Sequence, residues 1–483
     1  MKFKISKSYI ILISVLTLIA IVLSVSGCAN GQTSSDISGA TVSEAAASEA
    51  TTALASGASK THLAEKDITV NETLNNAESG GHAITADGES AAYSNVLVTK
   101  SGDSEGDEAD FYGENSAVFA TNKGTLDLNN IVVKTNGTHA NAVFSYGEGT
   151  TVNIADSYIN TTGNCSGGLM TTGGGTMNAS NLTIETSGNS SAAIRSDRGG
   201  GTVNVNGGYY STSGKGSPVI YSTADITVSD AEMVSTASQG VVVEGKNSVT
   251  LNNVDLTADN NTKNSDKSSY YQAVMIYQSM SGDAAQGLSS FAMNGGSLVN
   301  KNGDVFFVNN TVTQISLNNA AITNEGDGIF LRAAAAGWGK EGSNGGQVTL
   351  NAANQTINGD MIVDSVSSLN LYLKSSSSFT GAVNSDGAQG DVYVEIEKGS
   401  KWTLTADSYI SSLTCDADSI DLNGHKLYVN GKEYTAGSAS KGTAIEIKTT
   451  SSDSGRSGGQ EPPQGEAPPD GGKPDGEPPA KPD

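Results

Sequence analysis

Short runs of alternating apolar and polar residues recur along most of the chain. The segments TLDLNNIVV, TVNIADSYI, TMNASNLTI and TVNVNGGYY begin at Thr125, Thr151, Thr176 and Thr202. The first apolar positions of these and the next two repeats are separated by 26, 25, 26, 23 and 23 residues. Each repeat holds three such runs, separated by Gly, Asn, Ser and Asp, which is typical of three strands and three turns. We therefore predict an all-β solenoid, a parallel β-helix with three strands per coil.

One turn of the repeat is occupied by residues that accept a left-handed backbone. The residues in this position are Asn130, Asp156, Asn181, Gly207, Asp230, Asn253, Gly295 and Asn319. Asn, Asp and Gly tolerate the left-handed conformation better than other residues do. The column predicts one fixed turn stacked repeat upon repeat, and it favours turn formation and ladder hydrogen bonds over ligand binding by these asparagines.

The third run of each repeat is apolar at successive positions. Because alternate residues of a strand face opposite sides, this strand is expected to be apolar on both faces. The expected outer stripe consists of Val118, Val143, Leu169, Val219, Val242, Met275, Phe306 and Phe330. A continuous apolar stripe on a surface is normally covered or used for binding, so we predict that loops, the N-terminal segment or a second chain bury it.

The N-terminus predicts export. Lys2, Lys4 and Lys7 precede an apolar stretch over 10–25 that is too short for a comfortable membrane span. The sequence Val-Ser-Gly-Cys that ends at Cys28 resembles the lipobox of bacterial lipoproteins. This resemblance implies a signal peptide over 1–28 and a lipidated Cys28, carrying palmitate-type acyl chains, that anchors the chain in the membrane.

Composition divides the remainder into three parts. Residues 29–60 are rich in Ser, Ala and Thr and predict a flexible tether. Residues 61–447 hold the β-helix, and residues 448–483 contain eight of the nine prolines, which predicts a disordered acidic tail. The net charge of −24 argues against nucleic acid as a partner, and the membrane is expected to be contacted through the lipid alone. Cys165 and Cys415 are too few for a disulfide scaffold.

The repeat over Ala64–Tyr434 resembles the right-handed parallel β-helix, or pectate-lyase-like, superfamily. Segments such as SAAIRSDRGGGTVNVNGG, YQSMSGDA and the closing WTLTADSYISSLTCDADSIDLNGHKLYVNGKEY are most similar to adhesin-like surface lipoproteins of clostridial type. The resemblance implies a right-handed solenoid displayed outside the cell. It leaves the activity open, because this fold carries lyases, hydrolases, tailspikes and adhesins.

Insertions and a charged corner mark where a site is expected. Insertions lie at 101–114, 257–271, 279–288 and 332–346. The position after the third strand reads Ser145, Thr171, Arg195, Tyr221, Glu244, Tyr277 and Arg332. All three arginines of the body, Arg195, Arg198 and Arg332, lie in this corner, and Trp338 lies near it. Two interpretations stand: a ladder of ion pairs that holds the turns, or a recognition strip of Arg, Tyr and Trp for sugars or carboxylates.

Catalytic and metal sites are less clearly marked. Pectate lyases of this fold hold Ca²⁺ with clustered carboxylates, and here Asp103, Glu105 and Asp107, with Glu108 and Asp110 beside them, form one acidic loop. Their spacing matches no EF-hand, and a solvated acidic loop is the favoured interpretation of these residues. None of the histidines lies among the corner residues, and we assign no acid–base pair. No cofactor is predicted, with Ca²⁺ as the alternative at this loop.

These patterns predict a non-enzymatic, lipid-anchored surface protein whose β-helix binds an extracellular glycan or another surface protein. The residues expected to contact the ligand are Arg195, Arg198, Tyr221, Tyr277, Arg332 and Trp338. The alternatives are a polysaccharide lyase or glycoside hydrolase that acts in the same cleft, and a structural spacer that binds no ligand.

Overall fold

The computed structural model describes residues 60–447 except 264 and 266. These residues lie in one compact unit, Ala58–Asp483. The predicted signal peptide with Cys28, nearly all of the predicted tether at 29–60 and the predicted tail at 448–483 lie outside the described residues.

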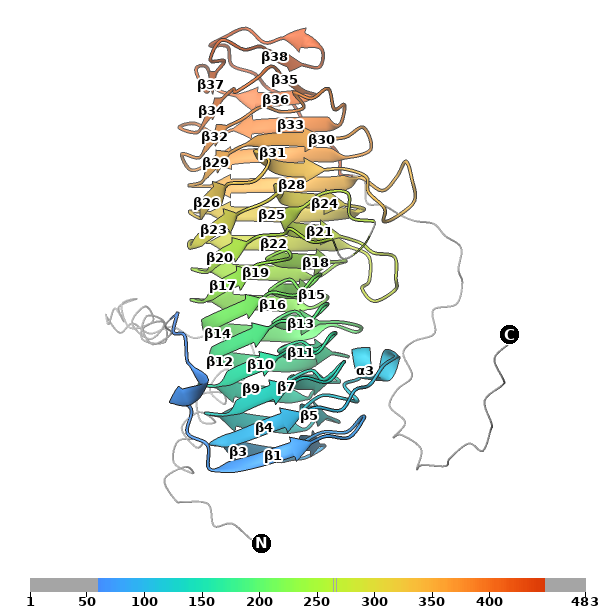
Figure 1. Cartoon of the computed structure of the whole chain (residues 1–483). Helices are drawn as coiled ribbons and strands as arrows, with labels where there is room; N and C mark the ends of the chain where they lie inside the picture. Colours follow the sequence, from blue (N-terminus) through green and yellow to red (C-terminus); the bar gives the residue numbers. More distant parts are fainter. Residues whose placement is uncertain (1–59, 264, 266, 448–483) are drawn as a thin grey trace, which may run out of the picture. The chain divides into compact units, whose positions relative to one another are not determined.

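The described part is a stack of strands in which each strand pairs in parallel with the equivalent strand of the neighbouring repeats (Figure 1). The first ladder begins with Ser90↔Thr125 and continues with Thr125↔Thr151. Its strands are β3 (Ser90–Ser94), β6 (Thr125–Asn129), β9 (Thr151–Ala155), β12 (Gly175–Thr186), β14 (Gly201–Thr212), β16 (Asp225–Ser229), β19 (Ser248–Asn252), β22 (Leu288–Asn294), β25 (Thr311–Asn318), β28 (Gly346–Ala353), β31 (Ser368–Lys374), β33 (Asp391–Ile396) and β36 (Ser412–Cys415).

The second ladder belongs to the same large sheet, because β12 and β14 run through both ladders without a break. Its other strands are β1 (Glu72–Asn76), β4 (Val96–Lys100), β7 (Val132–Thr135), β10 (Tyr158–Thr161), β17 (Glu232–Ser235), β20 (Asp255–Ala258), β23 (Ser297–Asn300) and β26 (Ala321–Asn324). A separate sheet holds β29 (Thr356–Asn358), β32 (Ser378–Thr380), β34 (Lys401–Thr403) and β37 (Ile420–Asp421).

The third ladder forms its own sheet and corresponds to the apolar third run of the repeat. It consists of β2 (Ile84–Asp87), β5 (Val118–Thr121), β8 (Val143–Tyr146), β11 (Leu169–Thr172), β13 (Ile194–Ser196), β15 (Ile220–Ser222), β18 (Val241–Glu244), β21 (Gln272–Tyr277), β24 (Asp304–Asn309), β27 (Ile329–Ala333) and β30 (Asp360–Val363). These ladders confirm the prediction of an all-β parallel solenoid.

The last strands form a small sheet of β35 (Ser408–Ile410), β38 (Leu427–Val429) and β39 (Lys432–Glu433), in which β38 and β39 pair antiparallel. Within the described residues, helix is confined to the 3-10 turn η1 (Glu65–Asp67) and to α3 (Asp107–Phe111). None of these helices has the length and apolar character needed to cross a membrane.

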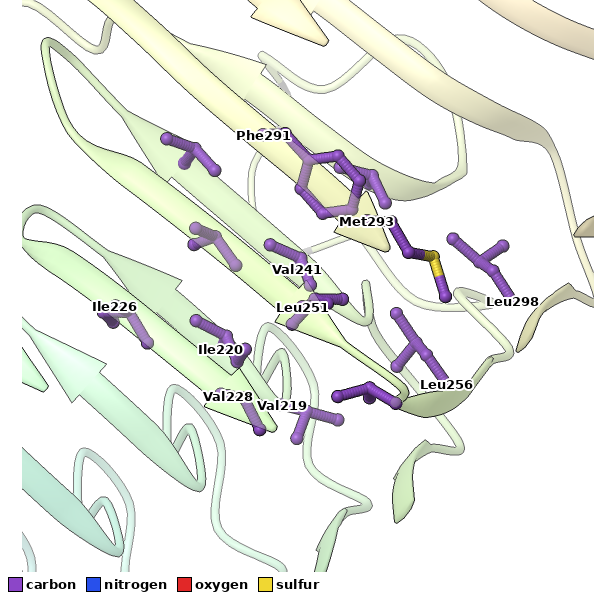
Figure 2. Close-up of a cluster of buried hydrophobic side chains, with 14 of the residues drawn as sticks. Val219, Ile220, Ile226, Val228, Val241, Leu251, Leu256, Phe291, Met293 and Leu298 are labelled. Carbon is purple, nitrogen blue, oxygen red and sulfur yellow. The ribbon is translucent and has the colours of Figure 1, made fainter. Parts of the chain in front are cut away.

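The core runs through the stack between the ladders. Figure 2 shows its middle, where Ile226, Val228 and Leu251 of the first ladder meet Ile220 and Val241 of the third. Since each layer of side chains packs on the next, the core is continuous rather than divided among repeats. Cys165 and Cys415 are both free cysteines, so no disulfide joins them.

The predicted turn column is confirmed. Its non-glycine members have φ between 49° and 54°, as at Asp156 and Asp230, and Gly207 and Gly295 have φ of 75° and 66°. The side chains also form ladders, since Asn253 donates to Asp230 at 2.6 Å. These asparagines and aspartates therefore stabilise turns, as the residue types indicate.

The predicted outer stripe of the third strand is partly wrong. Val118, Val143, Leu169, Val219, Phe306 and Phe330 belong to the core, and Figure 2 shows Val219 among the core side chains. Only Val242 and Met275 of the predicted stripe face outward, where they form a second apolar cluster. Both faces of this strand are apolar, so the sequence pattern does not distinguish registers that differ by one residue, and a one-residue slip exchanges the faces.

Candidate functional site

The outward positions of the third ladder form one file, which we call the outer file. Arg195 pairs with Tyr221, Tyr221 with Val242, Met275 with Phe307, and Phe307 with Arg332. The complete outer file is Thr85, Phe119, Phe144, Met170, Arg195, Tyr221, Val242, Met275, Phe307, Arg332 and Ile362. Glu244 and Tyr277 pair with each other two positions further along their strands. The corner column expected from the sequence therefore combined two outward files with the inward Ser145 and Thr171.

Two insertions cover the centre of the outer file. Val242, Met275, Tyr277 and Phe307 are buried under Tyr270, Ala336 and Trp338, which come from the insertions at 257–271 and 332–346. The backbone N–H of Gly337 donates to Lys267 O at 3.1 Å. A Cβ on Gly337 would lie only 2.6 Å from Lys267 Cα, so the close approach of the two insertions requires glycine. The prediction that loops bury an outer apolar stripe is confirmed for this segment.

The insertions and the outer file border an open cleft of 740 Å³. Its lining includes both aromatic side chains and lysines. The aromatic residues are Tyr221, Tyr271, Tyr277 and Trp338, and the lysines are Lys263, Lys267 and Lys340. Among the residues that the structure describes, none of these three lysines forms a salt bridge with an acidic side chain. The cleft thus presents cationic groups in a strongly acidic chain.

Glu244 accepts hydrogen bonds from two tyrosines that line the cleft and so fixes their positions. Its carboxylate is 1% exposed and accepts hydrogen bonds from the hydroxyls of Tyr221 and Tyr277, the latter at 3.1 Å. The N–H of Ser279 donates to its other oxygen at 3.3 Å. Burial raises the pKa of both tyrosines, and the Glu244 charge raises each further, so both hydroxyls stay protonated donors. The two phenol groups are therefore fixed in place and are not available as bases.

Tyr277, which is expected from the sequence to contact a ligand, is largely covered. It is 8% exposed and makes an edge contact with Trp338, with ring centroids 5.1 Å apart. The ring is covered because the insertion at 332–346 folds back over the outer file. The structure brings Tyr221, Tyr277 and Trp338 together at one cleft, which is three of the six residues predicted to contact a ligand.

The three arginines lie outside the lining of that cleft and are occupied by carboxylates. Arg195 pairs with Asp197 at 2.9 Å. Arg198 pairs with Asp283 at 2.6 Å and with Asp107 at 2.8 Å. These contacts agree with the interpretation in which ion pairs hold the turns. A ligand contact by the arginines stays a prediction.

Arg332 makes the most complete of these pairs. Its Nε and Nη2 donate to the two oxygens of Asp304 at 2.7 and 3.1 Å. Its guanidinium also lies over the ring of Tyr270, 4.2 Å from the centroid. Arg332 thus supports the insertion at 257–271 from below, because Tyr270 belongs to that insertion.

The acidic loop is not arranged as a set of metal ligands around Asp103, Glu105 and Asp107. Asp103 accepts the N–H of Thr138 at 2.7 Å, and Asp107 is the partner of Arg198. Within the described residues, the side chains that converge as metal ligands do are Asp110, His139 and Cys165. A Ca²⁺ site at this loop stays a prediction.

Sequence patterns identified the insertions but not the side chains that they bring to the cleft. The repeat pattern does not predict the positions of Lys263, Lys267 and Tyr271, because insertions have no equivalent in neighbouring repeats. Their position inside an insertion next to an apolar outer face was the available signal. Comparisons with protein-family models, curated proteins and solved structures find no match to this chain.

Proposed function

We propose that this chain is a lipid-anchored surface protein of adhesin-like type that binds an acidic glycan in the cleft between the insertions at 257–271 and 332–346. We also infer that its body is a single right-handed β-helix with three strands per coil, of the pectate-lyase-like superfamily. The repeat pattern and the three ladders support this architecture. The lipobox resemblance at Cys28 supports display outside the cell.

The observation that carries the proposal is the combination, in one cleft, of aromatic rings with lysines that form no salt bridge to an acidic side chain among the described residues. A volume of 740 Å³ is in the range of small-molecule sites, about 300–1,000 Å³. Aromatic faces provide flat apolar contact for sugar rings. Lysine ammonium groups in a cleft favour carboxylate or sulfate groups, and the surrounding negative charge of the chain disfavours anions elsewhere.

Binding is favoured over the alternative of a lyase or hydrolase by the state of Glu244. A general base must reach the proton that it removes. Glu244 is instead buried behind the wall of the cleft and is occupied by two phenol donors and a backbone N–H. This arrangement positions rings and does not present a carboxylate to a substrate.

The cleft predicts a specific binding defect. We expect the full-length protein to bind oligosaccharides that carry uronic acid or sulfate, more weakly as salt increases. Trp338→Ala should weaken binding by about 0.5–1.5 kcal/mol beyond the lost contact area. Lys263→Ala should reduce the preference for acidic over neutral sugars. A glycan array followed by titration calorimetry measures both.

The matched controls lie elsewhere on the same body. Tyr409 is exposed and stacks on Tyr428, and Lys374 lies over Tyr372. Tyr409→Ala and Lys374→Ala should leave the affinity unchanged. Equal losses in the control variants would contradict the cleft as the site. The absence of any glycan ligand would favour the spacer alternative, and release of unsaturated or reducing products would favour the enzyme.

The anchor has its own test. Cys28→Ser is expected to remove lipidation, so that the protein leaves the detergent phase and enters the aqueous phase. Cys415→Ser, which changes a buried cysteine of the body, should partition as the natural protein does. A Cys28→Ser protein that remained in the detergent phase would show that the lipobox interpretation is wrong.

A further inference from the structure

Three chemically reactive side chains meet at a corner that is separate from the cleft lining. Asp110 comes from α3 in the insertion at 101–114. His139 and Cys165 occupy equivalent turn positions of successive repeats, with φ of 57° and 54°. The turns are stacked, since His139 N donates to Asn164 O at 2.9 Å and Cys165 N donates to Asn189 O at 2.8 Å. The backbone of the solenoid therefore fixes the histidine beside the cysteine.

The three groups converge on one point. One donor atom from each residue lies within 4.8 Å of those of the other two, and His139 Nδ1 lies 3.1 Å from Asp110 Oδ1. A catalytic relay would place thiol and carboxylate on opposite sides of the imidazole, about 7 Å apart. The thiol and the carboxylate here are closer than that. The geometry is that of ligands around a common centre.

The contact between His139 and Asp110 is close but poorly directed. His139 is 9% exposed, and within the described residues its buried Nδ1 lies 3.1 Å from the Asp110 oxygen without good hydrogen-bond geometry. Buried polar atoms normally form well-directed hydrogen bonds, so this contact between two metal-ligand types leaves a place for a further partner. A bound cation would satisfy the nitrogen, the carboxylate and the sulfur together.

We propose that Asp110, His139 and Cys165 form a binding site for a divalent transition metal ion of the Zn²⁺ class. Thiolate and imidazole ligands select such ions over Ca²⁺ and Mg²⁺. Zn²⁺ binds sulfur at about 2.3 Å and nitrogen or oxygen at about 2.0–2.2 Å. Three protein ligands leave a fourth position for water or an external ligand.

The surroundings are compatible with a cation. Arg195 and Arg198 are the nearby positive groups that act on Asp110, and both are held by carboxylates of their own, Arg195 by Asp197 and Arg198 by Asp107 and Asp283. A thiolate and a carboxylate balance the two charges of the ion. A metal-bound cysteine is a thiolate and a metal-bound histidine is neutral, so metal binding should release protons.

The test is metal binding by the full-length protein after treatment with a chelator. We expect calorimetry with Zn²⁺ to show one site per chain with proton release, and Co²⁺ to give the absorption of a thiolate-bound tetrahedral ion. Cys165→Ser should abolish the Co²⁺–thiolate absorption and weaken Zn²⁺ binding by at least about 10-fold. Asp110→Asn should weaken Zn²⁺ binding in the same direction.

Further substitutions in the same chain provide the controls for folding and for the specificity of metal binding. Ser190 occupies the position of Cys165 in the next repeat with φ of 54°, so serine fits the left-handed turn. Asparagine tolerates the same conformation, which makes His139→Asn a second variant that keeps the backbone. Cys415→Ser removes the other body cysteine and should leave binding unchanged. No stoichiometric Zn²⁺ binding, or equal binding by Cys165→Ser, would overturn the proposal without affecting the glycan-binding cleft.

Discussion

Arg332→Met is expected to destabilise the protein by about 3–5 kcal/mol. The Asp304 side chain is 1% exposed, and Arg332 supplies both of its charge-assisted hydrogen bonds. Removal of the guanidinium leaves a buried carboxylate without its countercharge, which costs more than the pair itself contributes. Chemical denaturation of the variant and the natural protein measures the difference. The double variant Arg332→Met/Asp304→Asn should recover much of the loss, because it carries no buried charge.

The deficit of Arg332→Met should also depend on pH. Burial raises the pKa of Asp304, which Arg332 opposes, so without Arg332 the folded-state pKa rises further. A carboxyl group whose pKa is higher in the folded than in the unfolded state favours folding at low pH, and this benefit is lost as pH rises through the folded-state pKa. The deficit should therefore shrink as pH falls below neutral. A pH-independent deficit, or a double variant as unstable as the single one, would contradict a structural role for the pair.

The second large effect distinguishes the two faces of the third ladder. Phe306 is fully buried between Phe291 and Phe330, with ring centroids 5.6 and 5.5 Å away. Phe306→Ala leaves a cavity in a close-packed core and is expected to cost about 3–5 kcal/mol. The free energy of unfolding, from denaturant titration, measures this loss. Because the core is continuous, the loss should appear in global unfolding.

Phe307→Ala is the matched control on the outer file. Phe307 is equally buried but lies under Tyr270, 5.3 Å between ring centroids, in the second apolar cluster. Its loss should loosen the insertion at 257–271, seen as faster proteolysis and amide exchange there, with a smaller global effect because a loop can collapse onto the gap. The reverse pattern in the two variants would show that the strand faces the other way.

The repeat, the parallel stacking and the left-handed turns could be predicted from the sequence alone. Turn residues are informative because a left-handed backbone excludes most side chains, as at Asp156 and Asp230. Insertions were also visible in the sequence, since they interrupt a fixed period. The turns depend on local conformation, whereas the stacking and the insertions could be predicted because many repeats share one period.

The facing of the third strand and the partners of the charged side chains could not be predicted from the sequence, because both depend on packing between distant parts of the chain. Val219 and Val242 have the same chemistry, and which of them enters the core depends on the register set by the neighbouring repeat. Arg198 meets Asp283, and Asp110 meets His139, across insertions whose paths no periodicity fixes. Such contacts join residues far apart in the chain, so they follow from how the insertions pack on the solenoid and not from the pattern within a repeat.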